Sequence, residues 1–217
     1  MSAVSDQFKR YHLGCGRTIL EDFLNIDGQF DWLEAKLQEG AAYPVTQIPS
    51  AAIMKHDLSK GIPAPDGSLK VVYHCHFLEH LQNPDGKNIL LECYRSLAPG
   101  GRMRIAVPDF ELWCKNYIEK KDEFFQWYKD TYLAPVKQYY RTNGEIFTGM
   151  IYNWGHCMAY DRETLTKILE EIGFVEIRTM DWGESKCLDD IAKIETNDNQ
   201  RKFESLIIEC TKGHFLK

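Results

Sequence analysis

The chain lacks the features of secreted and membrane-spanning proteins. Residues 1–6 lead into no apolar stretch of the kind found in a signal peptide, and no run is apolar enough to cross a bilayer. The seven cysteines are an odd number and include no Cys-x-x-Cys pair, which argues against a disulfide framework. We therefore expect a cytoplasmic protein with reduced thiols.

Positive charge is also in short supply. The formal net charge is −6 at pH 7, with 26 lysines and arginines against 32 acidic residues. A general nucleic-acid or anionic-membrane binder needs a basic face, so we expect neither partner. Arg95, Arg102 and Arg104 are interpreted as solvated side chains rather than a nucleic-acid track. A chain of 217 residues without an apparent internal repeat is typical of a single domain.

Strand and helix patterns alternate along the chain. Short apolar runs predict seven strands, at residues 10–13, 23–27, 52–58, 69–76, 102–108, 174–180 and 204–211. Helical spacing predicts helices at residues 30–37, 88–97, 111–132 and 161–172. This alternation predicts an α/β, Rossmann-like fold, with a mostly parallel seven-stranded sheet and helices on both faces. Since no full crossover helix separates the last two strands, we expect the final strand to be antiparallel.

Residues 109–154 are much richer in aromatic side chains than the chain as a whole, whose mean is 12%. We interpret them as a helical insert after the fifth strand. Inserts at this point of an open sheet line its crevice, so we expect a lid or a substrate wall. The alternative is that the aromatic residues simply seal the ends of the strands.

The first two predicted strands end in residues that suit a nucleotide. Gly14 and Gly16 would let the backbone approach a ligand without a Cβ, and Asp27 could accept hydrogen bonds from ribose hydroxyls. Only about ten residues separate Gly16 from Asp27, too few for the usual crossover helix, so we expect that helix to be shortened or lost. A dinucleotide dehydrogenase needs that helix for the pyrophosphate and is disfavoured. Residues 1–9 and the insert are the first candidates to cover the gap.

The ordered motifs of the chain resemble those of class I S-adenosylmethionine-dependent methyltransferases. Within that class they resemble a small bacterial group with a Leu-x-Leu-Gly-Cys-Gly opening and a nearby Asn-x-Asp. The matching stretches are residues 12–16, 25–27, 56–58, 73–81, 92–101, 104–109, 156 and 165–174. The most diagnostic part is Leu-Glu-His-Leu at 78–81 followed by Leu-Ala-Pro-Gly-Gly at 97–101. The resemblance covers nearly the whole chain and implies a single methyltransferase domain over 1–217, with 109–154 as its insert.

The resemblance also implies a cofactor, S-adenosyl-L-methionine, which becomes S-adenosyl-L-homocysteine. Gly14, Cys15 and Gly16 would pass under its methionine and ribose part, and Asp27 would hold the ribose hydroxyls. The other implied contacts are Asp57 with the adenine amino group, the Leu58 amide with the ring, and the backbone carbonyls of His74 and Cys75 with the methionine ammonium. No third glycine follows Gly16, which departs from the general pattern.

Methyl transfer from a sulfonium requires an aligned acceptor and the exclusion of water. A hydroxyl acceptor also needs a base, and histidine suits that task near neutral pH. His76, just beyond the fourth predicted strand, and His156, at the end of the insert, are the candidate catalytic residues. We interpret His80 as a packing residue instead.

A metal site is the competing interpretation of these histidines. His74, Cys75, His76 and His80, with His156 and Cys157, are residue types that bind zinc. On a strand, however, His74 and His76 would point one way and Cys75 the other. We therefore expect no metal site.

Taken with the resemblance, these observations predict methyl transfer to a small molecule by a monomer or homodimer. The favoured acceptor is a hydroxyl oxygen of a saccharide or natural-product intermediate, as in biosynthetic tailoring. The alternatives are a nitrogen, carboxylate or phosphorus-bearing acceptor, the last two if Arg141 or Lys137 faces the crevice. A protein or RNA methyltransferase fits the acidic charge less well. A binding protein without turnover is disfavoured because Gly14, Asp27 and Asp57 are intact.

Overall fold

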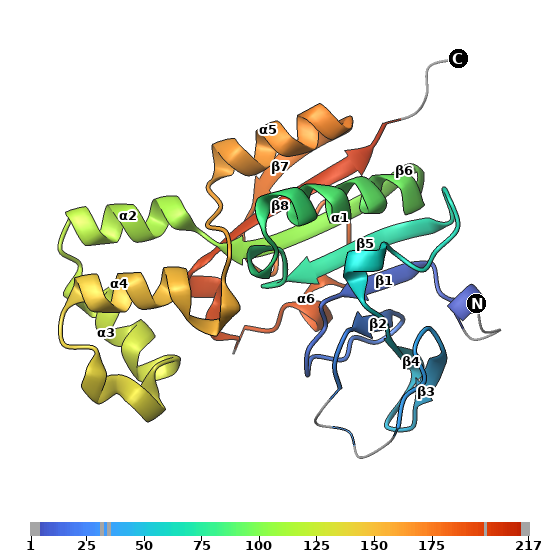
Figure 1. The fold of residues 1–217 in the computed structure, drawn as a ribbon. Coiled ribbons are helices and arrows are strands. Elements are labelled where there is room, and N and C mark those ends of the chain that lie inside the picture. The colour runs from blue at the N-terminus through green and yellow to red at the C-terminus, as the bar shows by residue number, and fades with distance from the viewer. Residues whose placement is uncertain (1–4, 31–32, 34–35, 198, 214–217) are drawn as a thin grey trace.

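The computed structural model describes residues 5–30, 33, 36–197 and 199–213, and a single eight-stranded sheet runs through them (Figure 1). The strand order is β3-β4-β2-β1-β5-β6-β8-β7. The strands are β1 (Arg10–Leu13), β2 (Leu24–Asp27), β3 (Ala42–Val45), β4 (Ile48–Lys55), β5 (Leu69–Cys75), β6 (Leu97–Pro108), β7 (Phe174–Met180) and β8 (Ser205–Lys212).

The strand directions confirm the expected fold class. The pairs β1–β2, β1–β5, β2–β4 and β5–β6 are parallel. The last strand, β8, lies between β6 and β7 and is antiparallel to both, as predicted. The sheet has one strand more than expected, because β3 pairs antiparallel with β4 at an edge. Pro44 lies in β3, and a proline in a strand is tolerated at such an edge.

Two helices cover one face of the sheet, α1 (Asn83–Ser96) and α5 (Arg162–Ile172) (Figure 1). The predicted boundaries of α5 are confirmed. The Asp161 side chain accepts a hydrogen bond from the Thr164 amide at its start, and Gly173 ends it with φ of 108°. The helix predicted at 30–37 falls partly outside the described residues, and its described members, 30, 33 and 36–37, are not helical.

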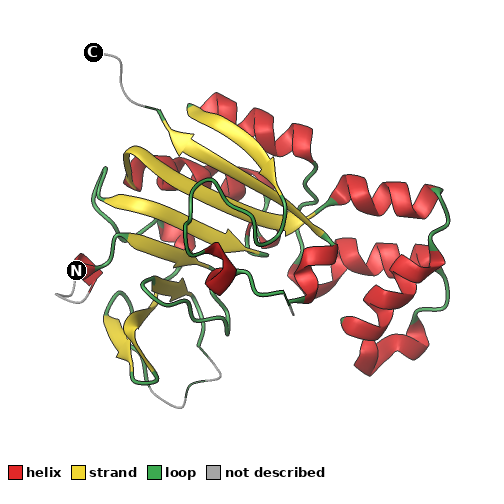
Figure 2. Ribbon diagram, turned by 180° about the vertical axis from the view of Figure 1, so that it is seen from behind, coloured by secondary structure: helices red, strands yellow, loops and turns green. Residues whose placement is uncertain are grey.

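The opposite face is covered by the long connection between β7 and β8, which contains the short helix α6 (Ile191–Ile194) (Figure 2). The described chain from 14 to 23 makes turns and no helix, so the expected loss of the first crossover helix is confirmed. Leu20 and Phe23 pack against Leu188, Ile191 and Ile194 instead. The gap is therefore filled by the β7–β8 connection rather than by the insert or residues 5–9, while the rest of the range predicted at 1–9 lies outside the described residues.

A buried ion cluster joins this connection to the sheet. The Arg104 guanidinium on β6 donates to both Glu195 carboxylate oxygens at 2.8 and 2.5 Å, and to Glu209 at 2.8 Å. The side chain has no exposed surface, so its interpretation as solvated was wrong. Charge alone does not distinguish a surface arginine from one that is paired in the interior.

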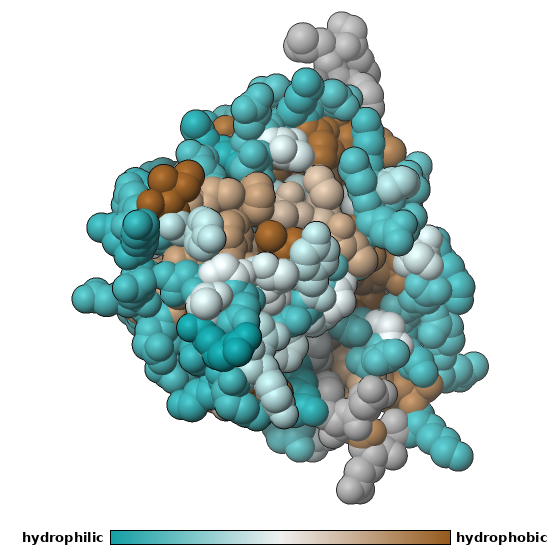
Figure 3. Space-filling view, turned by 60° about the vertical axis from the view of Figure 1, so that its left-hand side comes forward, coloured by the Kyte–Doolittle hydropathy of each residue, from teal (hydrophilic) through white to brown (hydrophobic). Residues whose placement is uncertain are grey.

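The insert forms a separate lobe of three helices, α2 (Phe110–Ile118), α3 (Asp122–Thr131) and α4 (Asn143–Tyr152) (Figure 1). The single helix expected at 111–132 is divided in two, with Lys120 at φ of 52° between them. The lobe has its own apolar core, built from Trp113, Phe125, Tyr128, Leu133, Ile146 and Met150. Figure 3 turns this side of the molecule forward and shows hydrophobic surface among hydrophilic margins. No helix in the described ranges is long and apolar enough to span a bilayer.

Candidate functional site

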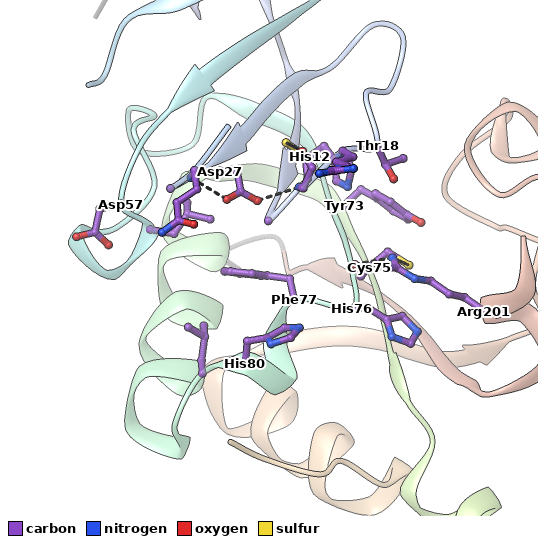
Figure 4. A pocket seen from close by; sticks show the side chains of 18 of the residues that line it. His12, Thr18, Asp27, Asp57, Tyr73, Cys75, His76, Phe77, His80 and Arg201 are labelled. Carbon is purple, nitrogen blue, oxygen red and sulfur yellow. Dashed lines mark hydrogen bonds between the residues drawn. The ribbon is translucent and has the colours of Figure 1, made fainter. Parts of the chain in front are cut away.

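A cavity of about 920 Å³, here called the main cavity, lies where β1, β2, β4 and β5 end (Figure 4). These four strands are parallel to one another, so the loops that follow them meet at the same edge of the sheet. The cavity brings together all but one of the predicted cofactor residues: Gly14, Cys15, Gly16, Asp27, Asp57, Leu58 and Cys75. The candidate base His76 lines it as well.

The two glycines after β1 have different functions. Both have a left-handed backbone, with φ of 59° at Gly14 and 53° at Gly16. A Cβ on Gly14 would lie 2.3 Å from Cδ2 of Phe77, so this glycine makes room for that ring. A Cβ on Gly16 would meet no described atom within 4 Å, so this glycine leaves open space in the main cavity. A ligand can approach the backbone there, as the cofactor resemblance requires.

Asp27 lies at the end of β2 and holds the glycine loop in place. Its Oδ2 accepts a hydrogen bond from the Gly16 amide at 2.8 Å, and its Oδ1 accepts one from the Gln29 amide at 3.0 Å (Figure 4). A carboxylate oxygen has a second lone pair, so each can still accept from a hydroxyl group. The residue therefore suits the recognition of a ribose.

Asp57 follows β4 and caps the short helix Leu58–Lys60. Its Oδ1 accepts from the amide and the hydroxyl of Ser59 at 3.0 and 2.7 Å. These hydrogen bonds lower the pKa of the Asp57 carboxyl. An ionised acceptor is thus present at the rim of the main cavity, beyond Asp27 (Figure 4).

Side chains alternate along β5, which separates its predicted site residues. Tyr73 and Cys75 line the main cavity, whereas His74 does not. The His74 ring is buried, edge-on to Phe77 at 5.9 Å, and neither ring nitrogen has a hydrogen-bond partner among the described residues. Burial lowers the pKa of His74 to about 3, so its ring is neutral. The prediction for His74 concerned its backbone carbonyl and stays a prediction.

His76 lies at the turn that leaves β5. Its backbone is left-handed, with φ of 53°, and its amide donates to the Ala106 carbonyl at 2.8 Å. Its Nε2 is hydrogen-bonded to the Ser205 hydroxyl at 2.7 Å, and its Nδ1 lies 3.4 Å from the Glu79 carboxylate. Burial, followed by the nearby charge of Arg201, lowers the pKa of His76 well below its usual value. An unusual backbone conformation fixed by three neighbours is common at functional sites.

A second cavity of about 270 Å³, here called the side cavity, shares His76, His80 and Arg201 with the main cavity. Its other lining residues are Glu79, Pro108, Tyr128, Tyr132, Trp154, His156 and Glu204. The structure therefore brings His76 and His156 to one cavity. The aromatic members Tyr128, Tyr132 and Trp154 come from the insert or its end.

The His156 and His80 rings both line the side cavity and contact each other edge to face, with ring centroids 4.9 Å apart. The Nδ1 of His156 is hydrogen-bonded to the Met150 carbonyl at 2.7 Å, so Nδ1 is the protonated nitrogen and Nε2 is an acceptor. Burial lowers the pKa of His156 and that of His80. Both rings are therefore neutral near pH 7.

Sequence reasoning missed three charged residues of these cavities. Burial raises the pKa of Glu79 to about 8 and that of Glu204 to about 7. Arg201 directs Nη1 at the Cys75 carbonyl and sulfur, at 3.3 and 3.4 Å. Glu79 stood within the Leu-Glu-His-Leu motif and could have been found there. Arg201 belongs to the polar β7–β8 connection, where no motif marked it.

The comparisons with known proteins agree with this geometry. Residues 12–105 match a family model described as a methyltransferase domain. A search of curated protein sequences found no match.

Several solved structures, two of them described as methyltransferases, have a similar fold. One from Thermotoga maritima, described as a possible histamine N-methyltransferase that depends on S-adenosylmethionine, is 14% identical, with a TM-score of 0.52 over 94% of this chain and 82% of that one. The CurJ carbon methyltransferase is 11% identical, with a TM-score of 0.52 over 99% of this chain and 50% of that one. The YcgJ protein of Bacillus subtilis is 10% identical, with a TM-score of 0.50 over 96% and 93% of the two chains. Identities this low show the fold and leave the acceptor open.

Proposed function

We propose that the chain is a class I S-adenosylmethionine-dependent methyltransferase and that it methylates a hydroxyl oxygen of a small molecule bound in the side cavity. One observation carries this proposal: the side cavity adjoins the main cavity and shares His76, His80 and Arg201 with it. An acceptor and a methyl donor bound in the two spaces would meet at these shared residues.

The main cavity fits the cofactor. When bound, S-adenosylmethionine supplies a methyl group that is already activated by the positive charge of its sulfonium. The open space at Gly16 would take its methionine and ribose part, and Asp27 would accept hydrogen bonds from the ribose hydroxyls. Asp57 and the Leu58 amide would recognise the adenine, while the carbonyls of His74 and Cys75 would hold the ammonium group.

The chain supplies two groups that could take the acceptor's proton. His156 presents an unprotonated Nε2 because its Nδ1 is bonded to the Met150 carbonyl. His76 lies at the junction of the two cavities, where the acceptor oxygen would be closest to the methyl group. Removal of the proton as the carbon–oxygen bond forms is the step that either base would assist.

The insert would act as the lid and acceptor wall. Tyr128, Tyr132 and Trp154 offer aromatic surface beside buried polar groups, a combination that suits a sugar ring or a natural-product intermediate. With such an acceptor, the protein would be a cytoplasmic enzyme that modifies biosynthetic intermediates, and it would work as a monomer or homodimer.

A second candidate acceptor is an amine. Glu79 and Glu204 are two buried carboxyls in a cavity with three aromatic rings, and this combination also attracts a cation. In that case the carboxyls would bind the acceptor as an ammonium ion. A neighbouring histidine would take one proton from it, which makes the nitrogen lone pair available for methylation.

A turnover screen would decide between these acceptors. The wild-type protein is incubated with S-adenosylmethionine and with panels of sugars, nucleotide sugars, phenols and amines, and the methylated product is identified by mass. His76→Asn and His156→Asn should each be tested for kcat and, by calorimetry, for cofactor affinity. Loss of a general base should lower kcat about 10²–10⁴-fold with little change in cofactor affinity.

A matched control comes from the same lobe. Tyr139→Phe changes an exposed side chain that lines neither cavity and should leave kcat unchanged. Full turnover in both histidine variants would refute a base at either position, and methylated amines without methylated hydroxyls would favour the second acceptor.

A further inference from the structure

We propose that the side cavity contains a binding site for a divalent transition-metal ion, formed by Glu79, His80 and His156. One ligand atom from each residue lies within 4.8 Å of the other two. The residues come from two separate segments, the turn after β5 and the end of the insert, so their meeting is a property of the fold.

Glu79 is the first reason to expect a cation. Its side chain is only 1% exposed and lines the side cavity, yet neither carboxylate oxygen has a hydrogen-bond partner among the described residues. Two ring nitrogens approach its Oε1, that of His76 at 3.4 Å and that of His80 at 4.0 Å. A buried carboxyl without hydrogen bonds is costly in folding free energy, and a bound metal ion would remove that cost.

The two histidines already have the orientation of metal ligands. A histidine that binds a metal usually directs its other ring nitrogen at a backbone carbonyl or a carboxylate. His156 bonds Nδ1 to the Met150 carbonyl at 2.7 Å. Nδ1 of His80 is the nitrogen on the Gly155 side, which leaves its Nε2 facing Glu79.

Backbone hydrogen bonds hold the two segments together. The Glu79 carbonyl accepts from the amides of Cys157 at 2.7 Å and Met158 at 3.1 Å. The residue that supplies the carboxylate thus also anchors the chain next to His156. Ligands fixed in this way lose little freedom when they bind an ion.

Two imidazoles and one carboxylate are a recognised ligand set for zinc and for other first-row divalent ions, with a position left open for substrate. In a tetrahedral zinc site the ligand atoms are about 3.3–3.5 Å apart, because each metal bond is about 2.0–2.2 Å. Side-chain rotations that bring the ligand atoms about 1 Å closer together would therefore complete the site. From the sequence we expected no metal site at His80 and His156 together with His74, Cys75, His76 and Cys157, whereas the structure places the first two histidines beside Glu79 instead of beside the strand ligands.

The ion would take part in the proposed methyl transfer, and its role in turnover rests on that proposed function. A divalent cation in the side cavity would attract electron density from an acceptor hydroxyl and make its proton easier to remove. His156 would then be a ligand, and His76 would be the base that receives the proton. The acceptor oxygen forms its bond to the methyl carbon as the carbon–sulfur bond breaks, and the sulfur leaves as a neutral thioether.

Cobalt titration tests the site without any cofactor or acceptor. The full chain is treated with a chelator, exchanged into metal-free buffer and titrated with Co²⁺, whose visible absorption reports the coordination. We expect one equivalent to bind with an absorption band of a four- or five-coordinate ion, and Zn²⁺ to displace it. Glu79→Gln and His156→Asn should weaken binding by about 100-fold or more, since loss of an outer-shell partner alone costs 10–100-fold.

Two controls separate this site from adventitious binding. His56→Ala removes another histidine that lies beside a glutamate, 3.5 Å from Glu39, and should leave Co²⁺ affinity unchanged. His76→Asn should also retain Co²⁺ binding to within about threefold, although the loss of a base lowers turnover. Circular dichroism and cofactor calorimetry confirm that each variant is folded.

The metal inference is overturned if the folded wild-type protein binds no stoichiometric Co²⁺, or if binding survives in Glu79→Gln and His156→Asn. Either result leaves the proposed methyl transfer standing, because cofactor binding and turnover are measured separately. Conversely, Co²⁺ binding without any turnover would support the metal site and count against the proposed acceptor.

Discussion

A methyl group added at Gly14 should lower the folding stability much more than one added at Gly16. Both residues have φ near 55°, a conformation that costs an ordinary residue about 1–2 kcal/mol. At Gly14 the new Cβ would also lie 2.3–2.7 Å from Phe77, and forcing that ring aside costs about 1–3 kcal/mol more. We therefore expect the free energy of unfolding to fall by about 2–5 kcal/mol in Gly14→Ala but only about 1–2 kcal/mol in Gly16→Ala.

Gly16→Ala, the less destabilised variant, should nevertheless lose affinity for the cofactor. The Cβ of Gly16→Ala would project into open space of the main cavity, where the cofactor would pass. This variant should remain folded and lose about tenfold or more in affinity for S-adenosylmethionine, equivalent to about 1.4 kcal/mol. Urea unfolding gives the stability and calorimetry gives the affinity. Equal destabilisation of the two variants, or undiminished affinity in Gly16→Ala, would refute this account of the glycine loop.

Three further predictions concern other parts of the molecule. Because burial lowers the pKa of His74 to about 3, the unfolded chain takes up a proton below pH 6.5 that the folded chain refuses, and stability falls by about 1.4 kcal/mol per pH unit from pH 6.5 down towards pH 3. His74→Leu should lack this loss, so its free energy of unfolding in urea should fall less between pH 7 and pH 5 than that of the wild type. An equal fall in the two proteins would contradict the conclusion that His74 is neutral in the folded state. Arg104→Met leaves Glu195 and Glu209 buried without their cation and should lower the free energy of unfolding by about 3–5 kcal/mol, whereas a loss below about 1 kcal/mol would show that the cluster is not stabilising. Trp113→Ala removes the centre of the insert's core and should cost about 3–5 kcal/mol locally, so that limited proteolysis cuts the insert faster while calorimetry finds cofactor affinity unchanged.

Much of the fold follows from local sequence patterns. The β-branched strand at residues 69–75 and the capped helix that begins after Asp161 have strong local signals, and both formed as predicted. The short distance from Gly16 to Asp27 correctly predicted the loss of a crossover helix. What fills the vacant face could not be predicted, because the packing of Leu20 against Ile194 joins residues far apart in the chain.

The site was predictable where residues follow strands and unpredictable where the fold brings distant charges together. Gly16 follows β1 and Asp27 ends β2, and because these neighbouring strands are parallel, the meeting of the two residues follows from topology. Glu79 lay within a recognised motif but its burial could not be predicted, and Arg201 gave no signal at all, since the burial of an ionisable side chain depends on tertiary packing. Arg104 shows the same limit: the identical residue type can be solvated or fully buried.

Binding of S-adenosylmethionine in the main cavity is required for every step proposed for this chain, and one calorimetric titration tests it. The wild-type protein should bind the cofactor with a stoichiometry of one. Asp27→Ala should weaken that binding by about tenfold or more, since it removes a charged acceptor of hydroxyl hydrogen bonds. Asp66→Ala, which removes a carboxylate that is 82% exposed and outside both cavities, should bind as the wild type does. Absence of binding to the folded wild-type protein, or equal affinity in Asp27→Ala, would contradict the account.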